Sequence, residues 1–299
     1  MAELALVVTL ALAIVWRFRL NMLDLDVQSR RDEIFWMEDT ASTWSTQVLC
    51  PSIHEAPSKY LSVVIPAYNE EKGLPSTINE TLRYLDERSF DDANFTYEVT
   101  IIDDGSEDLT YNVTLDHASR LRVIKQTPNL GKGAAIRKGV LCSRGQLVIT
   151  ADADSAIFIR DMGKLEEKAL NLTASGDPIA VFGSRCKVKQ PLLRSIMSKV
   201  FHALAVLITG TDVADTQCGL KLFTRPAAAR LFTNLRLQRW AFDVELIYLA
   251  RRLGIPVYEV AVNAVDVTGS KLRASSVCHA LYEITMVVIA YGLGFWEIR

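Results

Sequence analysis

Short apolar runs alternate with amphipathic stretches from Leu61 to Ala261. Apolar runs rich in Val and Ile are typical of buried strands, and apolar side chains three or four residues apart are typical of helices. We therefore expect strands at residues 61–65, 98–102, 121–125, 146–150, 179–183, 220–223 and 255–261, and helices at about 73–88 and after residues 131, 156 and 239. Because strands and helices alternate with short links, the pattern predicts an α/β fold with a doubly wound, mostly parallel sheet.

The N-terminal end of the chain carries a separate apolar stretch. Residues 4–16 are almost purely apolar, Arg17 and Arg19 follow them, and the only earlier charge is Glu3. This order favours a transmembrane anchor over residues 1–20, with a cleaved signal peptide or a buried helix as the alternative. The positive-inside rule then places the rest of the chain in the cytosol. The polar stretch that follows, 21–59, lacks periodicity and is interpreted as a linker.

A second apolar stretch, residues 278–296, lies near the C-terminus and is long enough to span a thin bilayer. Glu283 falls near its middle, where a carboxylate costs about 3 kcal/mol to insert. We therefore expect residues 272–299 to form a membrane-interfacial or docked helix. Residues 195–210 are another candidate interfacial helix, and ordinary core packing is the alternative for both segments.

Composition narrows the possible functions. The chain has 299 residues, of which 49% are hydrophobic, enough for one large α/β domain or two smaller ones. A net charge of −2 provides no general attraction for nucleic acid. The five cysteines form no Cys-x-x-Cys pair, so neither a zinc site nor a disulfide framework is predicted. Asn-x-Ser/Thr sequons begin at Asn79, Asn94, Asn112 and Asn171, and should be bare in a cytosolic domain.

Polar and acidic side chains follow three of the predicted strands, in the segments 66–70, 103–106 and 152–154. Ligands of parallel sheets bind beyond the carboxyl ends of the strands, so these segments should form one site. Asp152 and Asp154 are one residue apart and can share a face. A divalent cation relieves the repulsion between such carboxylates, and Mg²⁺ or Mn²⁺ then takes further ligands from substrate phosphates. An ordinary acidic turn is the alternative for residues 103–106.

The sequence of motifs resembles glycosyltransferase family 2, whose members have the GT-A fold. The resemblance rests on Val-Val-Ile-Pro-Ala-Tyr-Asn-Glu-Glu at 63–71, Ile-Asp-Asp-Gly-Ser at 102–106, Asn-Leu-Gly-Lys-Gly at 129–133 and Ala-Asp-Ala-Asp at 151–154. Segments 183–185, 215–223 and 239–246 are similar to the polyprenyl-phosphate branch of that family. The resemblance runs from about Leu61 to Lys271, which implies a GT-A domain over residues 60–271.

The resemblance implies an inverting hexosyltransferase. It would move glucose from UDP-glucose to dolichyl phosphate and produce dolichyl β-D-glucosyl phosphate for N-glycan precursor assembly. The enzyme would be a single-pass protein of the endoplasmic reticulum membrane, with its catalytic domain in the cytosol. Two alternatives stay open: a dolichyl-phosphate mannosyltransferase that uses GDP-mannose, and an inactive nucleotide-binding scaffold of the same fold.

The resemblance also implies roles for single residues. The nucleotide sugar would contact Pro66, Tyr68, Glu70, Asp103, Asp104, Lys132 and Asp152. The metal, Mg²⁺ or Mn²⁺, would be held by Asp154 with Asp152. The catalytic set would comprise Asp152, Asp154, Gln217 and Asp243, where Asp243 orients the sugar or only caps a helix. The acceptor phosphate would meet Arg185, Arg194 and Lys271.

The acceptor chemistry agrees with this assignment. The second pKa of a phosphate monoester is about 6, so the nucleophile is largely ionised at neutral pH and needs no general base. The four histidines lie outside every motif named above. No catalytic histidine is therefore expected.

Overall fold

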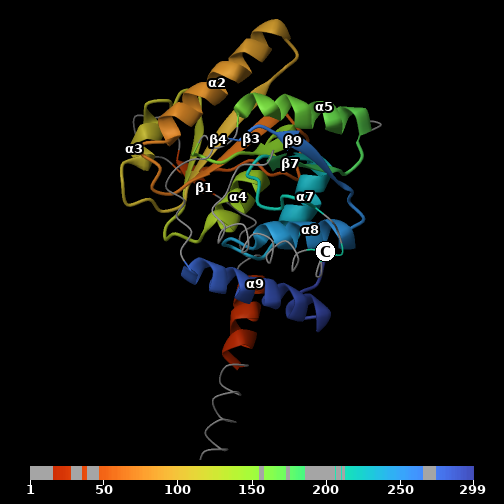
Figure 1. Ribbon diagram of the computed structural model, residues 1–299. Coiled ribbons are helices and arrows are strands. Elements are labelled where there is room, and N and C mark those ends of the chain that lie inside the picture. Colours follow the sequence, from red (N-terminus) through yellow and green to blue (C-terminus); the bar gives the residue numbers. More distant parts are fainter. Residues whose placement is uncertain are drawn as a thin grey trace, which may run out of the picture.

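The computed structural model describes residues 16–27, 36–38, 47–154, 158–172, 176–185, 206, 210, 213–264 and 274–299. Figure 1 shows a layered arrangement in which a twisted sheet lies between helices, with α9 below them. The sheet contains seven strands in the order β5-β4-β3-β6-β8-β7-β9. Their bounds are β3 Lys59–Ala67, β4 Tyr97–Asp103, β5 Arg122–Lys125, β6 Gly145–Thr150, β7 Ala180–Arg185, β8 Lys221–Thr224 and β9 Val257–Val262.

One strand of the sheet runs against the others. β3 pairs in parallel with β4 and β6, and β4 with β5, whereas β8 is antiparallel to both of its neighbours, β6 and β7. Since the direction reverses twice, β7 and its parallel partner β9 run the same way as β6. The carboxyl ends of β3, β4, β6 and β7 therefore lie at one edge of the sheet, together with the start of β8.

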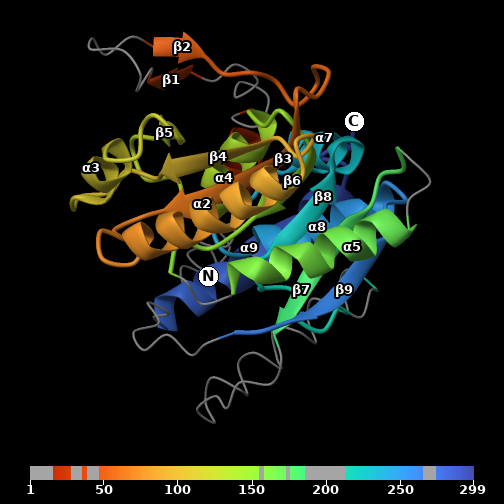
Figure 2. The ribbon, with the colours of Figure 1, turned by 90° about the horizontal axis from the view of Figure 1, so that it is seen from above.

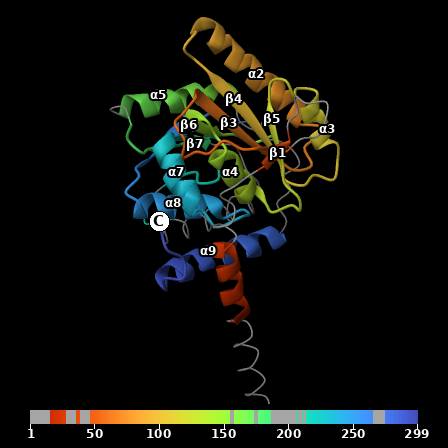
Figure 3. The ribbon, with the colours of Figure 1, turned by 180° about the vertical axis from the view of Figure 1, so that it is seen from behind.

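Helices cover both faces of the sheet, as Figures 2 and 3 show from above and from behind. One face carries α2 Leu74–Asp91 and α5 Met162–Leu172, which follows the short 3-10 helix η1 Ile159–Asp161. The other face carries α4 Lys132–Leu141, α7 Arg225–Asn234 and α8 Phe242–Arg252. A shorter helix, α3 Thr110–Leu115, lies near β5 at the edge of the sheet.

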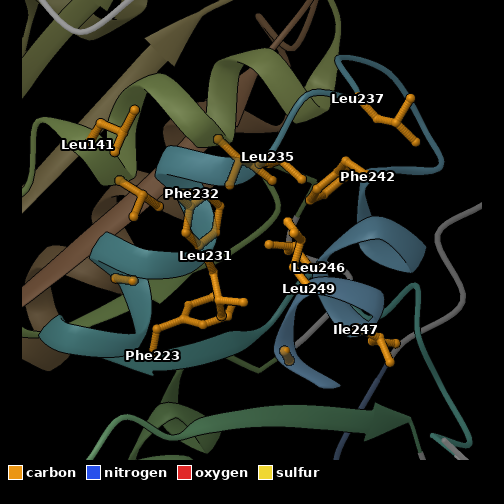
Figure 4. Packing of buried hydrophobic residues seen from close by; sticks show 14 of the residues in the cluster. Leu141, Phe223, Leu231, Phe232, Leu235, Leu237, Phe242, Leu246, Ile247 and Leu249 are labelled. Atoms are coloured by element: carbon orange, nitrogen blue, oxygen red, sulfur yellow. The ribbon is translucent and has the colours of Figure 1, made fainter. Parts of the chain in front are cut away.

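The core has two parts because alternate strand residues point to opposite faces. Leu61, Val63 and Ile65 of β3 are buried on the side of α2, whereas Val64 is buried on the side of α4. The second part continues through α7 and α8, where the rings of Phe223 and Phe232 meet edge to face with centroids 5.1 Å apart (Figure 4).

The C-terminal helix α9, Ala274–Gly292, lies under α8 and contributes to the same core. Its buried side chains include Ile284, Val287 and Ala290. A helical segment over residues 16–27 meets this region, where the indole N–H of Trp296 donates to the carbonyl oxygen of Met22 at 2.9 Å. From there the segment projects away from the sheet (Figures 1 and 3).

The strands and the long helices lie close to their predicted positions, but several elements were not predicted. These are α3, α7 and an antiparallel pair of short strands, β1 Trp36–Glu38 and β2 Gln47–Leu49. The pair lies inside the predicted linker, and Cys50 and Ile53 just after it are buried. The last part of residues 21–59 therefore packs onto the domain.

The structure describes only parts of the predicted membrane segments. Residues 1–15 of the anchor and most of residues 195–210 lie outside the described residues. Of the helices in the described ranges, none combines the length and the apolar character needed to cross a membrane.

Candidate functional site

Loops from four strand ends and two helix starts meet at the edge of the sheet described above. β3 leads to Tyr68 and Glu70, β4 ends at Asp103, β6 leads to Asp152 and Asp154, and β7 ends at Arg185. Lys132 begins α4 and Asp243 lies in the first turn of α8. Parallel strands place their carboxyl ends at one edge, which is the physical reason that motifs far apart in sequence come together. This edge, with these side chains, is called the rim below.

Asp152 is held by its neighbours on two sides. The Nζ atom of Lys132 lies 2.6 Å from its Oδ1 atom. The loop before β8 lies against the same carboxylate, since a Cβ built on Gly219 would fall 2.1 Å from Oδ2. Burial acts to raise the pKa of Asp152, but Lys132, supported by Lys221 and Arg185, lowers it below its ordinary value. Asp152 is therefore an ionised group with a fixed orientation.

A second ion pair lies deeper in the rim. The Nζ atom of Lys221, at the start of β8, is 2.9 Å from Oδ1 of Asp243, and both side chains are almost fully buried. Lys221 also donates to the carbonyl oxygen of Cys218 and faces the rings of Phe182 and Phe242. Burial raises the pKa of Asp243, and the two lysines of the rim oppose this shift. Lys132 is in turn kept charged, since Asp152 and Asp243 raise its pKa against the effect of burial.

Asp104 organises the turn that leads into α4. Its Oδ1 accepts hydrogen bonds from Gln126 Nε2 at 2.5 Å and from the backbone N–H of Leu130 at 2.9 Å. Its Oδ2 accepts from Asn129 Nδ2 at 2.9 Å and from the N–H of Gly131 at 2.8 Å. Burial raises the pKa of Asp104, and these donors act against the shift. The turn before Lys132 is thus built on the Asp104 carboxylate.

The glycines of the same turn are required for packing. A Cβ on Gly131 would meet the carbonyl oxygen of Gln238 at 2.7 Å, and one on Gly133 would meet that of Leu237 at 2.6 Å. The φ angle of Gly131 is 111°, which disfavours any side chain. These glycines hold α4 close to the segment before α8 and so locate Lys132.

The acidic turn after β4 is joined to the loop after β3. Asp103 is fully buried, and its Oδ1 accepts from the N–H of Ser106 at 3.1 Å. Asn69, with a positive φ of 53°, donates its backbone N–H to Ser106 Oγ at 3.0 Å. The N–H of Glu70 donates to Thr110 Oγ1 at 2.7 Å. The two loops form one surface, with Tyr68 39% exposed upon it.

Arg185 is paired with a carboxylate of the following loop. Its Nε and Nη2 atoms bind the two oxygens of Asp215 at 2.7 and 2.9 Å, a bidentate arrangement. The pair raises the pKa of Arg185 and, against the effect of burial, lowers that of Asp215. About a third of the Arg185 side chain, 32%, remains accessible. Gln217, two residues beyond Asp215, is exposed.

Sequence comparison identifies the family. A sequence model of glycosyl transferase family 2 matches residues 62–232, more than half of the chain. The chain belongs to glycosyltransferase family 2. It is a glycosyltransferase, and the sheet edge that its family motifs share is its candidate active site.

Relatives of this family 2 chain are similar over most of its length. It is 45% identical over 262 residues to a dolichyl-phosphate beta-glucosyltransferase of Mus musculus, covering 83% of this chain and 81% of the mouse protein. Proteins with the same name are 44% identical in Homo sapiens, over 74% of this chain and 72% of that protein, and 32% identical in Saccharomyces cerevisiae, over 80% and 77%.

Solved structures of low sequence identity share the fold. The glucosyl-3-phosphoglycerate synthase of Mycobacterium tuberculosis, in complex with UDP, superposes with a TM-score of 0.57 at 19% identity, over 79% of this chain and 81% of that one. The mannosyl-3-phosphoglycerate synthase of Rubrobacter xylanophilus gives 0.56 at 16% identity, over 81% and 77%. The predicted GT-A type α/β fold is confirmed.

The carboxylates of this family 2 rim fit a metal that binds jointly with a diphosphate. Within the described ranges, no three or more His, Cys, Asp or Glu side chains are grouped to hold a metal alone. Mg²⁺ commonly uses one or two carboxylates and takes its other ligands from substrate phosphates and water. Asp152 and Asp154 supply two carboxylates from one loop, which Thr77 Oγ1 fixes by donating to the carbonyl oxygen of Ala153 at 2.8 Å.

Most of the residues predicted for the site meet at the rim, and the roles assigned to them stay predictions. Arg194 and Lys271, predicted to bind the acceptor phosphate, lie outside the described residues. Sequence reasoning gave no role to Lys221, Asp215 or Gly219. A lysine within the apolar run 220–223 was the available signal for Lys221, because a charge in a buried strand needs a partner.

Proposed function

We propose that this glycosyltransferase moves glucose from UDP-glucose to the phosphate of dolichyl phosphate, with inversion at the anomeric carbon. The observation that carries the proposal is the 45% identity to the mouse dolichyl-phosphate beta-glucosyltransferase over more than four fifths of each chain. The product, dolichyl β-D-glucosyl phosphate, would serve N-glycan precursor assembly.

The donor is assigned to the rim between β3, β4 and β6. Pro66, Tyr68, Glu70 and Asp104 would hold the uridine together with Asp103, and Asp104 would also act through the turn that it builds. The exposed face of Tyr68 suits a base, since aromatic rings stack on nucleobases. Solved relatives in fold carry UDP-glucose and UDP with Mn²⁺, which supports a uridine nucleotide here.

The diphosphate is assigned to Lys132 and the two aspartates that follow β6. The Nζ atom of Lys132 already lies 2.6 Å from Asp152. Its positive charge is therefore next to the carboxylates that are assigned to the metal. Asp154, with Asp152, would hold Mg²⁺ or Mn²⁺, which when bound would neutralise charge on the departing UDP. Asp243 and Gln217 are assigned to the orientation of the glucose.

The acceptor phosphate needs positioning but no deprotonation. Its oxygen attacks the anomeric carbon on the face opposite UDP, the new C–O bond forms, and the bond from that carbon to the β-phosphate oxygen of UDP breaks. The guanidinium of Arg185, held in place by Asp215, provides a pre-oriented cation for the phosphate. Arg194 and Lys271 are proposed as further acceptor contacts.

The lipid acceptor requires an active site at a bilayer. Large apolar side chains are exposed on the segment 16–27 and on α9 and the turn after it, namely Trp16, Leu20, Leu23, Val27, Leu281, Val288 and Leu293. Exposed apolar faces on neighbouring helices favour contact with lipid. We accordingly propose the endoplasmic reticulum membrane, with an anchor over residues 1–20, α9 at the interface and the catalytic domain in the cytosol.

Transfer from labelled UDP-glucose tests this function directly. The protein in membranes, given UDP-glucose and dolichyl phosphate, should produce a chloroform-soluble glucolipid that mild acid cleaves. GDP-mannose is the matched donor control and should produce no lipid product. Mannose transfer in place of glucose transfer would support the mannosyltransferase alternative, and absence of both would support the inactive scaffold.

A substitution at the metal carboxylate tests the mechanism. Asp154→Ala should abolish transfer while UDP still binds weakly, because the developing charge on UDP is no longer neutralised. Asp154→Asn keeps the size of the side chain and should fail in the same way. An Asp154→Ala enzyme with full activity would contradict the metal role.

A further inference from the structure

Helix α9 places a buried carboxylate against the turn that precedes α8. Glu283 is only 3% exposed. Its Oε2 atom accepts a hydrogen bond from the backbone N–H of Ala241 at 3.0 Å, and the backbone N–H groups of Arg239 and Trp240 also favour the charged form of this carboxylate. Successive N–H groups that converge on one carboxylate fix the conformation of a turn.

The groups that face Glu283 come from its own helix and from this turn. His279 lies one helical turn earlier, with its Nε2 atom 3.7 Å from Glu283 Oε1, and Arg239 faces the carboxylate from the turn. Burial raises the pKa of Glu283, and the backbone donors of residues 239–241 act in the opposite direction. The carboxylate is thus satisfied mainly by backbone N–H groups.

The carbonyl groups of the same turn accept hydrogen bonds from the start of α4. The carbonyl oxygen of Gln238 accepts from the N–H of Ala134 at 2.9 Å, and that of Arg239 accepts from the N–H of Gly133 at 3.2 Å. Gly131 and Gly133 leave no space for even a methyl group against residues 237–239. Any displacement of the turn would therefore be transmitted to α4.

The start of α4 and the turn 238–241, which contact each other, both lie next to charged groups of the rim. Lys132 lies between the two glycines and binds Asp152 at 2.6 Å. Asp243 lies two residues after Ala241 and binds Lys221 at 2.9 Å. The turn 238–241 is thus the shared support of a lysine and an aspartate that come from different helices.

We propose that Glu283 is a positioning residue for the donor site, which acts through the turn 238–241 to set the positions of Lys132 and Asp243. The inference rests on the proposed function, because it takes the rim as the place where UDP-glucose binds. Glu283 lies beyond the region 62–232 that the family model matches, so the family match assigns it no role. It also joins the helix with an exposed apolar face to the donor site.

The test compares Glu283→Gln with Glu297→Gln in the full-length protein. The first substitution removes the charge and one acceptor oxygen at constant size. The second removes a carboxylate from the exposed side chain of Glu297, in the segment after α9. Titration with UDP in the presence of Mn²⁺ should show about tenfold weaker binding for Glu283→Gln and native affinity for Glu297→Gln.

Kinetics distinguish positioning from a general structural role. Glu283→Gln should raise the KM for UDP-glucose and leave the KM for dolichyl phosphate unchanged, because Arg185, which is proposed to meet the acceptor phosphate, is oriented by Asp215. If Glu283→Gln does not fold, Glu283→Asp decides, because its shorter side chain keeps the charge and should weaken UDP binding to a smaller extent.

Two outcomes would overturn the inference. UDP affinity equal to that of the native protein in the folded Glu283 variant, or an equal rise in both KM values, would show that the carboxylate only stabilises the fold. A native protein that binds no UDP would instead refute the proposed donor, and the inference with it.

Discussion

Asp152 occupies a space that only a glycine leaves open. Its Oδ1 atom binds Lys132, and a Cβ on Gly219 would lie 2.2 Å from its Cγ atom, far inside any real contact distance. Gly219 has no positive φ angle, so the requirement comes from the space beside the carboxylate and not from the backbone. The residue type at a position of the rim is therefore limited by the space beside its neighbours as much as by charge.

Gly219→Ala should lower the rate of glucose transfer in a protein that still folds. The added methyl group would displace the Asp152 carboxylate from Lys132, and a displacement of about 1 Å costs about 100-fold in rate. The readout is glucose transfer, with the melting temperature as the check on folding. Gly292→Ala is the control, because a Cβ there meets no atom within 4 Å. Native activity of Gly219→Ala would show that Asp152 does not need this orientation.

Lys221→Met should cost stability in a way that depends on pH. Removal of one partner from a buried ion pair destabilises a fold by about 3–5 kcal/mol. Burial already raises the pKa of Asp243, and without Lys221 this pKa rises further. The carboxyl becomes neutral as pH falls, so the deficit in the free energy of unfolding should be smaller at pH 5.5 than at pH 8.

The control for this measurement is Lys164→Met. Lys164 forms an ion pair with Asp161 at 2.7 Å, but its side chain is 46% exposed, so its loss should cost less than about 1 kcal/mol at either pH. Urea unfolding of both variants at the two pH values gives the comparison. An equal and small effect of the two substitutions would contradict the importance of burial for the Lys221–Asp243 pair.

At the scale of elements, a buried polar network joins α8, α9 and the helical segment 16–27. Arg236 donates from Nε to Asp26 Oδ1 at 2.7 Å and from Nη1 to the hydroxyl of Tyr291 at 3.0 Å. Tyr291 in turn donates to Glu245 Oε1 at 2.8 Å, and Glu245 accepts from the N–H of Leu237 at 2.6 Å. The helices are thus docked through satisfied polar groups as well as through apolar contact.

Glu245→Gln should change how stability depends on pH. Burial raises the pKa of Glu245 from 4.5 to about 6. A folded pKa above the unfolded one makes the contribution of this carboxyl complete below pH 4.5 and lost as pH rises through 6, by about 2 kcal/mol in total. Glutamine does not titrate, so the Glu245→Gln variant does not lose stability in this way. The free energy of unfolding of the variant minus that of the native chain should therefore rise by about 2 kcal/mol from pH 4.5 to 7.5.

Urea unfolding at these two pH values provides the measurement for Glu245. Glu297→Gln serves as the control, because it removes a carboxyl of the same type from an exposed side chain. A Glu245→Gln difference that does not vary with pH would mean that the carboxyl titrates alike in the folded and unfolded states.

At the scale of the whole molecule, the Asn-x-Ser/Thr sequons report on which side of the membrane the domain lies. Asn79, Asn94 and Asn112 open Asn-x-Ser/Thr sequences and are exposed on the folded domain. The side chains that would carry the glycans are therefore open to solvent. If the domain faces the cytosol, the sites stay bare because the glycosylation machinery acts on the lumenal side.

The electrophoretic mobility of the protein from cells should therefore not change on treatment with an N-glycosidase. A fusion that directs the same domain to the lumen is the positive control and should gain glycans at these sites. Glycans on Asn94 or Asn112 of the native protein would place the domain in the lumen and contradict the proposed topology.

Much of the fold could be predicted from the sequence. The buried strands β3, β4 and β6 and the helix α2 have strong periodicity, so local pattern located them to within a few residues. The helix α7 was missed because its sequence, from Arg225 to Asn234, mixes Pro, Ala and Arg with few large apolar side chains. The antiparallel direction of β8 was not predicted either, since an apolar run of four residues contains no information on direction.

The candidate site was predicted in outline for a similar reason. Strand-end motifs locate Asp104, Asp152 and Arg185, because parallel strands bring their ends together. Their partners are remote in sequence, as Lys221 is from Asp243 and Glu283 from Ala241, and no local pattern links such pairs. The use of Asp104 as the support of the Gly131 turn was likewise visible only in the contacts.

The succession of strands, helices and motifs along the chain, the family, and the edge at which the motifs gather were determined by the sequence alone, since periodicity and motifs are local properties. The pairing of each charge, the need for Gly219, and the support of the rim by α9 were decided only by the tertiary structure. The physical reason is that a buried charge is stabilised by whichever group the fold brings within about 3 Å, and that distance depends on the packing of the whole chain.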